Sequence, residues 1–190
     1  EDHPRTSNRE CSPSPDGPPA PKQFVFGCDT EAYPAAVAAG VDAANIGNNH
    51  GQDHGKEAML IGRALLEEVG LNPVGAGANE AEAGKPAFFD LNGWRVAVIG
   101  FGGVFPHEGW FATADRAGMR DGDTIETMVA AVEAADRFAD LVIVTIHWGV
   151  ELDTQPRPED RERAEAMIEA GADAIFGHHP HRLQPLEFVA

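Results

Sequence analysis

The sequence predicts an α/β fold built on a mixed sheet. Beyond residue 23, short apolar runs that are typical of strands alternate with longer segments whose apolar residues recur at helical spacing. The apolar runs are continuous, which is typical of strands covered on both faces. With 190 residues, of which 43% are hydrophobic, the chain can bury one sizeable core, so we expect a single domain over residues 1–190.

Residues 1–23 are predicted to form an extended, proline-rich segment. Residues 12–21 contain five prolines, which exclude a helix or an inner strand. We therefore expect this stretch to lie exposed on the surface.

The next elements follow from helical spacing and glycine stops. A short helix is expected over residues 31–39 and ends at Gly40, and a strand is expected over residues 41–46. A longer helix is predicted over residues 56–69, because its apolar residues fall on one face and Gly70 provides the C-terminal stop.

Asn92 and Gly93 form a strong two-residue hairpin signal between two strand-like runs, residues 86–91 and 95–100. An antiparallel hairpin makes the predicted sheet mixed. The remaining expected elements are, in order, a helix over 123–138, a strand over 141–146, a helix over 159–170, a strand over 174–176 and the beginning of another strand over 186–189.

The charge balance excludes one class of partner. Fourteen basic residues against 31 acidic residues give a formal net charge of −17, which argues against binding to DNA or RNA. A charge this far from zero causes self-repulsion that high salt would screen, so we interpret the composition as halophilic. An acidic protein from an ordinary source is the alternative.

The compartment is only weakly indicated. The sequence has no apolar run long enough to span a membrane and no visible signal peptide. Cys11 and Cys28 are expected to be free thiols in a reducing cytoplasm, although they could pair across the proline-rich loop if the chain is exported. The absence of a visible leader leaves the cytoplasm, the cell envelope and the extracellular space open, and the halophilic interpretation alone favours the cytoplasm.

Three loops that follow predicted strands carry imidazole and carboxamide groups, which are frequent metal ligands. The first contains Asn49 and His50, the second begins at His147, and the third holds His179 and His181. Sites in open α/β sheets lie at the carboxyl ends of strands, so we predict a metal site there, with a hydrolytic function. The alternatives are a polar turn that caps a helix in the first loop and a structural histidine in the second.

Pro180 restricts the backbone conformation of the third loop. Because Pro180 follows His179, we expect an extended conformation at His179 that aims both imidazoles at neighbouring points.

Other active-site classes lack support. The glycines in residues 75–80 lack the third small residue and the acidic partner of a dinucleotide-binding loop, so we interpret them as a turn. The sequence contains no Gly-x-Ser-x-Gly motif and no plausible cysteine–histidine pair, which disfavours covalent hydrolases.

Four motifs together resemble the CapA-type proteins of bacterial capsule and poly-γ-glutamate synthesis, a branch similar to the calcineurin-like metallophosphoesterases. They are Asn-x-Glu at residues 8–10, Asn-Asn-His-x-x-Asp-x-Gly at 48–55, His-Trp-Gly-x-Glu at 147–151 and Gly-His-His-Pro-His-x-x-Gln at 177–184. The second and fourth motifs are specific, and the resemblance covers nearly the whole chain. It implies a metallophosphatase-like four-layer α/β/β/α sandwich with mixed sheets.

The resemblance also implies a centre of two divalent metal ions. A site of carboxylate, carboxamide and imidazole groups suits manganese, iron or zinc. Glu10 would bridge the ions, Asn49, His147 and His179 would complete one of them, and His181 would bind the other. The catalytic residues would be His50, which stabilises the transition state or protonates the leaving oxygen, and Asp53, which orients His50.

The chain departs from the family pattern in two ways. It starts after the family's opening strand with its metal-binding aspartate, and it stops before a further family strand, so we expect a fragment or shortened member with one under-coordinated metal. Arg9 also stands where the family usually has an apolar residue.

The function implied by the resemblance is metal-dependent, phosphoesterase-type hydrolysis linked to an anionic capsule polymer such as poly-γ-glutamate. Two alternatives are a non-catalytic assembly or polymer-binding component and a metal-dependent amide hydrolase. The substrate would be an anionic phosphoester or a polyglutamate, attracted locally to the acidic chain by the metals and by arginines such as Arg157, Arg161 or Arg182.

Overall fold

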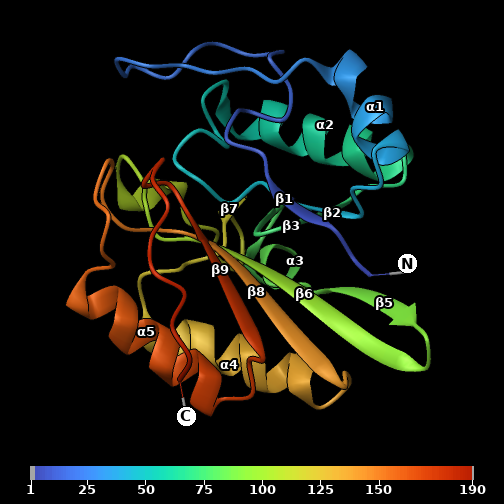
Figure 1. The fold of residues 1–190 in the computed structure, drawn as a ribbon. Coiled ribbons are helices and arrows are strands. Elements are labelled where there is room, and N and C mark those ends of the chain that lie inside the picture. Colours follow the sequence, from blue (N-terminus) through green and yellow to red (C-terminus); the bar gives the residue numbers. More distant parts are fainter. Residues whose placement is uncertain (1–2, 190) are drawn as a thin grey trace.

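Four layers of secondary structure stack on one another, as Figure 1 shows from top to bottom. The computed structural model describes residues 3–189. Helices α1 (Tyr33–Ala38) and α2 (Gly55–Glu68) form the first layer, two sheets form the middle layers, and α4 (Ile125–Asp136) and α5 (Pro158–Glu169) form the last layer. The predicted α/β/β/α sandwich is confirmed.

The first sheet is parallel and has the order β1-β2-β3. Its strands are β1 (Thr6–Asn8), β2 (Ala43–Asn45) and β3 (Asn72–Val74). Only β2 was predicted as a strand. β1 and β3 are three residues long, and the first is polar while the second contains Pro73, so neither carries a strand pattern.

The second sheet is mixed and has the order β5-β6-β8-β9. The hairpin of β5 (Ala87–Leu91) and β6 (Trp94–Gly102) is antiparallel, whereas β8 (Leu141–His147) and β9 (Ala174–His178) run parallel to β6. Asn92 and Gly93 have φ values of 52° and 87°, the left-handed conformation that a tight hairpin turn requires. The predicted hairpin and mixed sheet are therefore confirmed.

Smaller elements connect the layers. β4 (Ala76–Gly77) and β7 (Gly118–Met119) form a two-stranded antiparallel sheet, and the other short elements are α3 (Glu80–Ala83) and the 3-10 turns Thr30–Ala32 and Glu108–Trp110. The glycine-rich stretch at 75–80 thus provides β4 and the start of α3.

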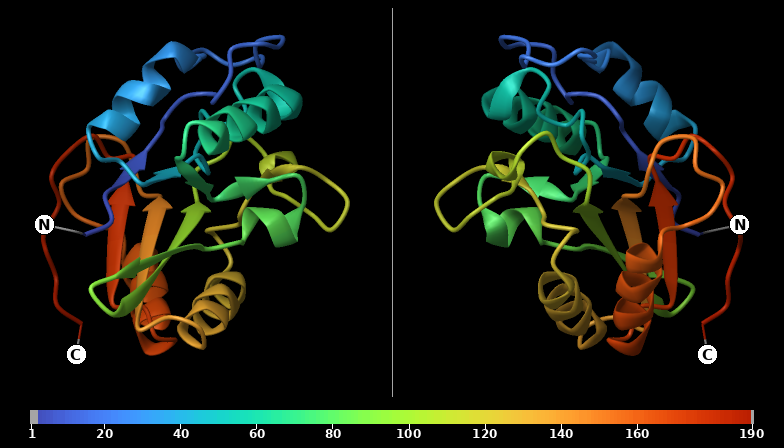
Figure 2. Two further views of the ribbon diagram at one scale, coloured as in Figure 1. Left: turned by 90° about the vertical axis from the view of Figure 1, so that its right-hand side faces the viewer. Right: turned by 90° about the vertical axis from the view of Figure 1, so that its left-hand side faces the viewer.

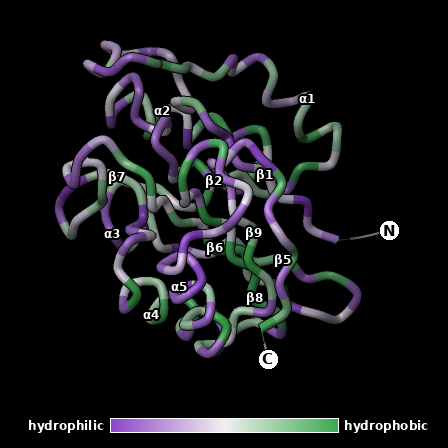
Figure 3. Tube along the Cα trace, turned by 60° about the vertical axis from the view of Figure 1, so that its left-hand side comes forward, coloured by the Kyte–Doolittle hydropathy of each residue, from purple (hydrophilic) through white to green (hydrophobic). Residues whose placement is uncertain are grey.

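Each helical layer buries apolar residues against its neighbouring sheet. Met59 and Leu66 of α2 belong to one buried cluster, and Met128 of α4 and Met167 of α5 belong to another. Figure 3 shows that hydrophobic residues concentrate along the central strands while the outer loops are mainly hydrophilic. This burial holds the sandwich together and leaves the ends of the strands to the polar loops.

A buried asparagine joins the two sheets. The Nδ2 atom of Asn45 in β2 donates to the main-chain oxygens of Phe101 and Thr145 in the second sheet, at 3.2 and 3.3 Å, and its Oδ1 atom accepts from the N–H of Gly47 at 2.9 Å. The side chain is fully buried, so these hydrogen bonds satisfy all its polar atoms and fix how the sheets meet.

The longer predicted helices and strands agree with the structure to within two residues at each end, but the expected strand at 186–189 is wrong. That stretch pairs with no strand among residues 3–189, and Leu186 and Phe188 are 85% and 93% exposed. Figure 2 shows the segment after β9 running back along the outside of the sandwich. The apolar residues at 186–189 therefore do not indicate a strand.

The expected exposure of residues 12–21 is wrong at its start, where Ser12 and Ser14 are fully buried. Pro13 lies against Gly62 of α2, where any larger residue would collide with it, and the Tyr33 hydroxyl donates to the Pro13 oxygen. A glycine on a neighbouring helix thus makes room for a proline-rich stretch.

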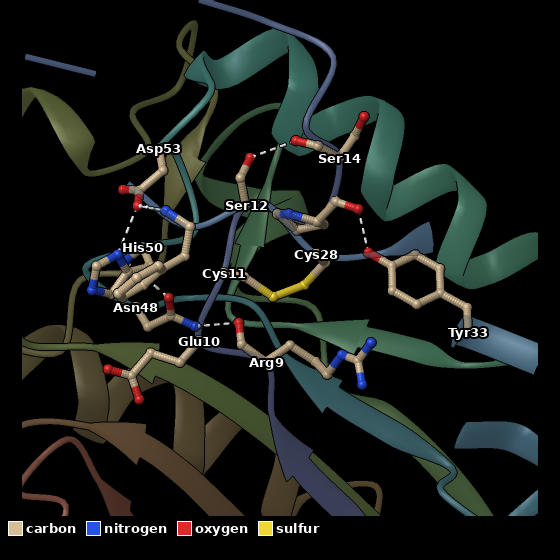
Figure 4. The surroundings of a disulfide bond; sticks show 12 residues. Arg9, Glu10, Cys11, Ser12, Ser14, Cys28, Tyr33, Asn48, His50 and Asp53 are labelled. Atoms are coloured by element: carbon tan, nitrogen blue, oxygen red, sulfur yellow. Dashed lines mark hydrogen bonds and ion pairs between the residues drawn. A yellow bond between two sulfur atoms is a disulfide. The ribbon is translucent and has the colours of Figure 1, made fainter. Parts of the chain in front are cut away.

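The expectation of free thiols is also wrong, because Cys11 and Cys28 form a disulfide with Cα atoms 5.3 Å apart. Main-chain hydrogen bonds of Ser12 with Phe26 and Cys28 close the same loop. Figure 4 shows Glu10 and His50 on one side of the disulfide and Tyr33 on the other. Residues far apart along the proline-rich segment are therefore joined beside the predicted site.

Within residues 3–189, no helix combines the length and apolar character needed to cross a membrane.

Candidate metal centre

Strands of both sheets deliver the predicted ligands to one place. Glu10 follows β1, Asn49 follows β2, His147 is the last residue of β8, and His179 directly follows β9. Because β1 and β2 are parallel, and β8 and β9 are parallel, each pair presents its carboxyl-terminal loops at one edge.

Four donor groups converge around His147. Its Nε2 atom lies 2.8 Å from Asn49 Oδ1, 3.1 Å from His179 Nδ1 and 3.7 Å from Glu10 Oε1. Ligand atoms of Glu10, His147 and His179 all lie within 4.8 Å of one another. The structure therefore brings together four of the five residues predicted as ligands.

His181, the fifth predicted ligand, lies on the open side of this group. Its Nε2 atom is 3.4 Å from Glu10 Oε1, and its side chain is 55% exposed. The Glu10 carboxylate thus contacts the imidazoles of both His147 and His181. Glu10 therefore lies between the candidate ligands of the two predicted ions.

The extended conformation expected at His179 is wrong. His179 and His181 have φ values of 98° and 53°, in the left-handed region that non-glycine residues rarely adopt. The main-chain N–H of Leu152 donates to the oxygen of Pro180 at 2.7 Å, which ties this turn to the loop after β8. Uncommon backbone conformations of this kind cluster at functional sites.

Burial keeps the central imidazoles neutral. Desolvation, followed by repulsion from neighbouring histidines, lowers the pKa of His147 to about 2, and burial also lowers the pKa values of His178 and His179. Burial raises the pKa of Glu10 although nearby histidines oppose the shift. Neutral imidazoles are the form that binds metal ions.

The two predicted catalytic residues are in contact. His50 Nδ1 lies 2.7 Å from Asp53 Oδ2, and both side chains are almost completely buried. Lys22 also belongs to this group, although no motif in the sequence indicated it. Its Nζ atom lies 2.5 Å from Asp53 Oδ1 and 3.1 Å from His50 Nδ1, and it donates to the main-chain oxygen of Asn49 at 2.5 Å. No sequence motif links Lys22 to His50, because the two residues meet only when the proline-rich loop folds back toward the site.

Two further asparagines hold the loops in place. Asn8 Nδ2 lies 3.2 Å from His147 Nδ1, whereas the other ring nitrogen, Nε2, contacts Asn49 and His179. Asn48 donates to the main-chain oxygen of Arg9 and accepts from the N–H of His50, which links the loops after β1 and β2. Both residues lie in the motifs read from the sequence, but their positioning roles follow only from the contacts.

The donor set fits a divalent metal ion. One carboxylate, one carboxamide and two neutral imidazoles suit manganese, iron or zinc. Ligand bonds of about 2.1 Å would place neighbouring donor atoms roughly 3.3 Å apart, close to the separations of 2.8 to 3.7 Å around His147 Nε2.

Two of the three arginines suggested for attracting an anionic substrate already form ion pairs within the chain. Arg157 makes two hydrogen bonds to the buried Asp160, and Arg161 pairs with Glu187. These two guanidinium groups are therefore neutralised locally by their own acidic partners.

A structural comparison supports the fold. A protein of Staphylococcus aureus, described as a 5′-nucleotidase and solved in complex with α-ketoglutarate, superposes with a TM-score of 0.52 at 18% sequence identity. The match covers 82% of this chain and 34% of that protein. At this level of identity, the likeness concerns the fold alone.

Sequence comparisons are more specific. The chain is 35% identical over 171 residues to the capsule biosynthesis protein CapA of Bacillus anthracis and 37% identical over 144 residues to the PGA biosynthesis protein CapA of Bacillus subtilis. It is 31% identical over 177 residues to a polyglutamine synthesis accessory protein, named as probable, of Mycobacterium tuberculosis. These matches cover 88%, 75% and 87% of this chain but only 41%, 37% and 46% of the relatives, so it spans less than half of their length.

A family model described as bacterial capsule synthesis protein PGA_cap matches residues 1–190. This match includes all four motifs that deliver the converging side chains. The chain therefore belongs to the bacterial capsule synthesis protein PGA_cap family.

Proposed function

We propose that this chain carries a metal-dependent hydrolytic site of the phosphoesterase type, acting in the synthesis or processing of an anionic capsule polymer such as poly-γ-glutamate. The observation that carries the proposal is the convergence of Glu10, His147 and His179, with ligand atoms within 4.8 Å, beside the buried pair of His50 and Asp53.

Glu10, Asn49, His147 and His179 would hold one ion, and Glu10 with His181 would hold a second. When bound, divalent metals supply an activated water and neutralise the negative charge that develops on a phosphoryl group. The chain's contribution is to keep its imidazoles neutral and in place before the metals bind, through burial of His147 and the contact from Asn8.

His50 would donate a proton to the leaving oxygen. Its Nδ1 atom faces Asp53 and Lys22, which leaves Nε2 as the ring nitrogen available to a substrate. Lys22 also contacts the Asp53 carboxylate, so the carboxylate is held between two partners and fixes the ring of His50. Such a positioned acid contributes about 10²–10⁴ to the rate.

The setting in capsule synthesis rests on the names of the relatives, which concern capsule, PGA and polyglutamine synthesis. The disulfide between Cys11 and Cys28 supports an oxidising compartment, since such bonds persist mainly in exported proteins. We therefore favour the cell envelope or the extracellular space over the cytoplasm as the place of action.

The proposal is tested with 4-nitrophenyl phosphate in the presence of manganese. We expect turnover by the wild type, and a drop in kcat of about 10²–10⁴ for His50→Asn at unchanged metal content. His54→Asn is the matched control, because His54 contacts the main-chain oxygen of Gly17 instead of the site.

The other outcomes identify the alternatives. Cleavage of a γ-glutamyl peptide without phosphatase activity would indicate an amide hydrolase. Binding of poly-γ-glutamate without metal or turnover would indicate an assembly or polymer-binding component, and either result contradicts the proposal.

A further inference from the structure

The segment that follows the proline-rich stretch lies against His50 and Asp53. Lys22 contacts Asp53, and the ring of Phe26 lies 4.4 Å from that of His50 between centroids, with an interplanar angle of 38°. The ring of Phe24 is nearly parallel to that of Phe26, at 6.5 Å and 22°. Phe26 therefore places an aromatic ring against His50, and Phe24 continues this row of rings.

The two phenylalanine rings are exposed, although hydrogen bonds hold the backbone at Phe26. Phe24 and Phe26 are 60% and 47% exposed. The N–H of Phe26 donates to Asp53 Oδ2 at 2.7 Å, and its oxygen accepts from the N–H of Ser12 at 2.8 Å. The disulfide at Cys28 anchors the same segment of the chain (Figure 4).

The exposure of these rings needs an explanation, because burying them in the core would stabilise the fold. The segment is also held by hydrogen bonds and the disulfide without any contribution from the rings. Exposed rings beside a site, on a segment that hydrogen bonds and a disulfide hold in place, are prepared for a ligand, since little backbone freedom remains to be lost on binding. Their row begins at His50 and leads away from it through Phe26 to Phe24.

We propose that Phe24 and Phe26 form an aromatic subsite for the leaving group, which selects phosphoesters of flat, apolar groups, such as aryl or nucleoside esters, over aliphatic ones. The proposal rests on the proposed function, because it takes His50 as the group that protonates the leaving oxygen. A leaving group bonded to that oxygen must then lie next to the ring of His50, where the row of aromatic rings begins.

The charge of the chain agrees with this choice. Among phosphoesters, one with a neutral aromatic leaving group brings less negative charge toward a protein of net charge −17 than one whose leaving group is itself anionic. Lys22 does not offset that repulsion, because it is already paired with Asp53.

Binding of two phosphonates, which cannot be hydrolysed, tests the subsite directly. Isothermal titration of the manganese-loaded chain compares phenylphosphonate with methylphosphonate, which differ only in the ring. We expect the wild type to bind phenylphosphonate about three- to tenfold more tightly, the range that one aromatic contact provides. Phe24→Ala should abolish this preference and Phe24→Trp should keep it.

Phe24 is the better position to vary, because it lies one ring away from His50 and its loss leaves the contact of Phe26 with His50 in place. Phe138→Ala is the matched control. Phe138 is 65% exposed like Phe24, but it lies just after α4 in the opposite helical layer (Figure 1), and its loss should leave the preference unchanged.

Equal affinities for the two phosphonates, a preference that survives Phe24→Ala, or no binding of either probe would overturn the subsite. Metal content measured on the same samples separates the two proposals. A loaded centre that binds both phosphonates equally contradicts only the aromatic subsite, whereas a chain that takes up no metal contradicts the proposed function.

Discussion

His147 illustrates how burial decides the chemistry of a single residue. Its imidazole is fully buried at the end of β8, and desolvation lowers its pKa to about 2. The side chain therefore stays neutral at any pH at which the protein works, as a metal ligand must. The cost of this arrangement is a fold that becomes less stable in acid.

We expect the free energy of unfolding of the metal-free protein to fall as the pH drops below about 6.5. Between the folded pKa of about 2 and the ordinary value of 6.5, the unfolded chain binds a proton that folded His147 excludes, so each lost pH unit costs about 1.4 kcal/mol. The pKa values of His178 and His179 are shifted in the same direction. Glu10, with its raised pKa, opposes the trend but is a single group.

Urea unfolding at pH 7 and pH 5.5 in the presence of a chelator measures this effect. The variant His147→Asn should show a smaller loss of stability between the two pH values than the wild type. Identical losses in both proteins would contradict the assignment of a neutral, buried His147.

Site residues that belong to a recognisable motif could be predicted from the sequence. Residues that reach the site only through the folding of a distant loop could not. His50 and Asp53 follow a strand that is recognisable from its apolar run, and their side chains are in contact. His147 ends another such strand and contacts Asn49. Lys22 reaches His50 only because the loop between the cysteines folds back, and no local pattern signals that path.

Among the helices and strands, the longer elements could be predicted from the sequence, whereas the three-residue strands β1 and β3 could not. The helix α2 has four turns of apolar spacing and a glycine stop, and the hairpin has its Asn92–Gly93 turn, so both were predicted. β1 has three polar residues and becomes a strand only by pairing with β2. Tertiary pairing therefore decides the short strands, and one of them leads to Glu10.

The loop closed by Cys11 and Cys28 is the element whose stability is most easily tested. A cross-link between residues 17 apart restricts the unfolded chain and is expected to stabilise the fold by about 3 kcal/mol. The double variant Cys11→Ser, Cys28→Ser should therefore unfold at a lower urea concentration than the oxidised wild type. A reductant should lower the wild-type midpoint and leave that of the double variant unchanged, and equal midpoints without reductant would contradict this account.

At the scale of the whole molecule, the net charge of −17 is the dominant property. Like charges repel one another in the compact state, and molar salt screens this repulsion. We expect the free energy of unfolding to be higher in molar potassium chloride than in dilute buffer, as the halophilic interpretation requires. Greater stability in dilute buffer would contradict that interpretation.

The sandwich brings four loops to one point, where we propose that metal ions bind. Elemental analysis of the wild type and of His179→Ala after equilibration with manganese tests this proposal. We predict two ions per wild-type chain and fewer in the variant, because His179 lies 3.1 Å from His147 and within the group of Glu10. A wild type without bound metal, or a variant that binds as much as the wild type, would contradict the account.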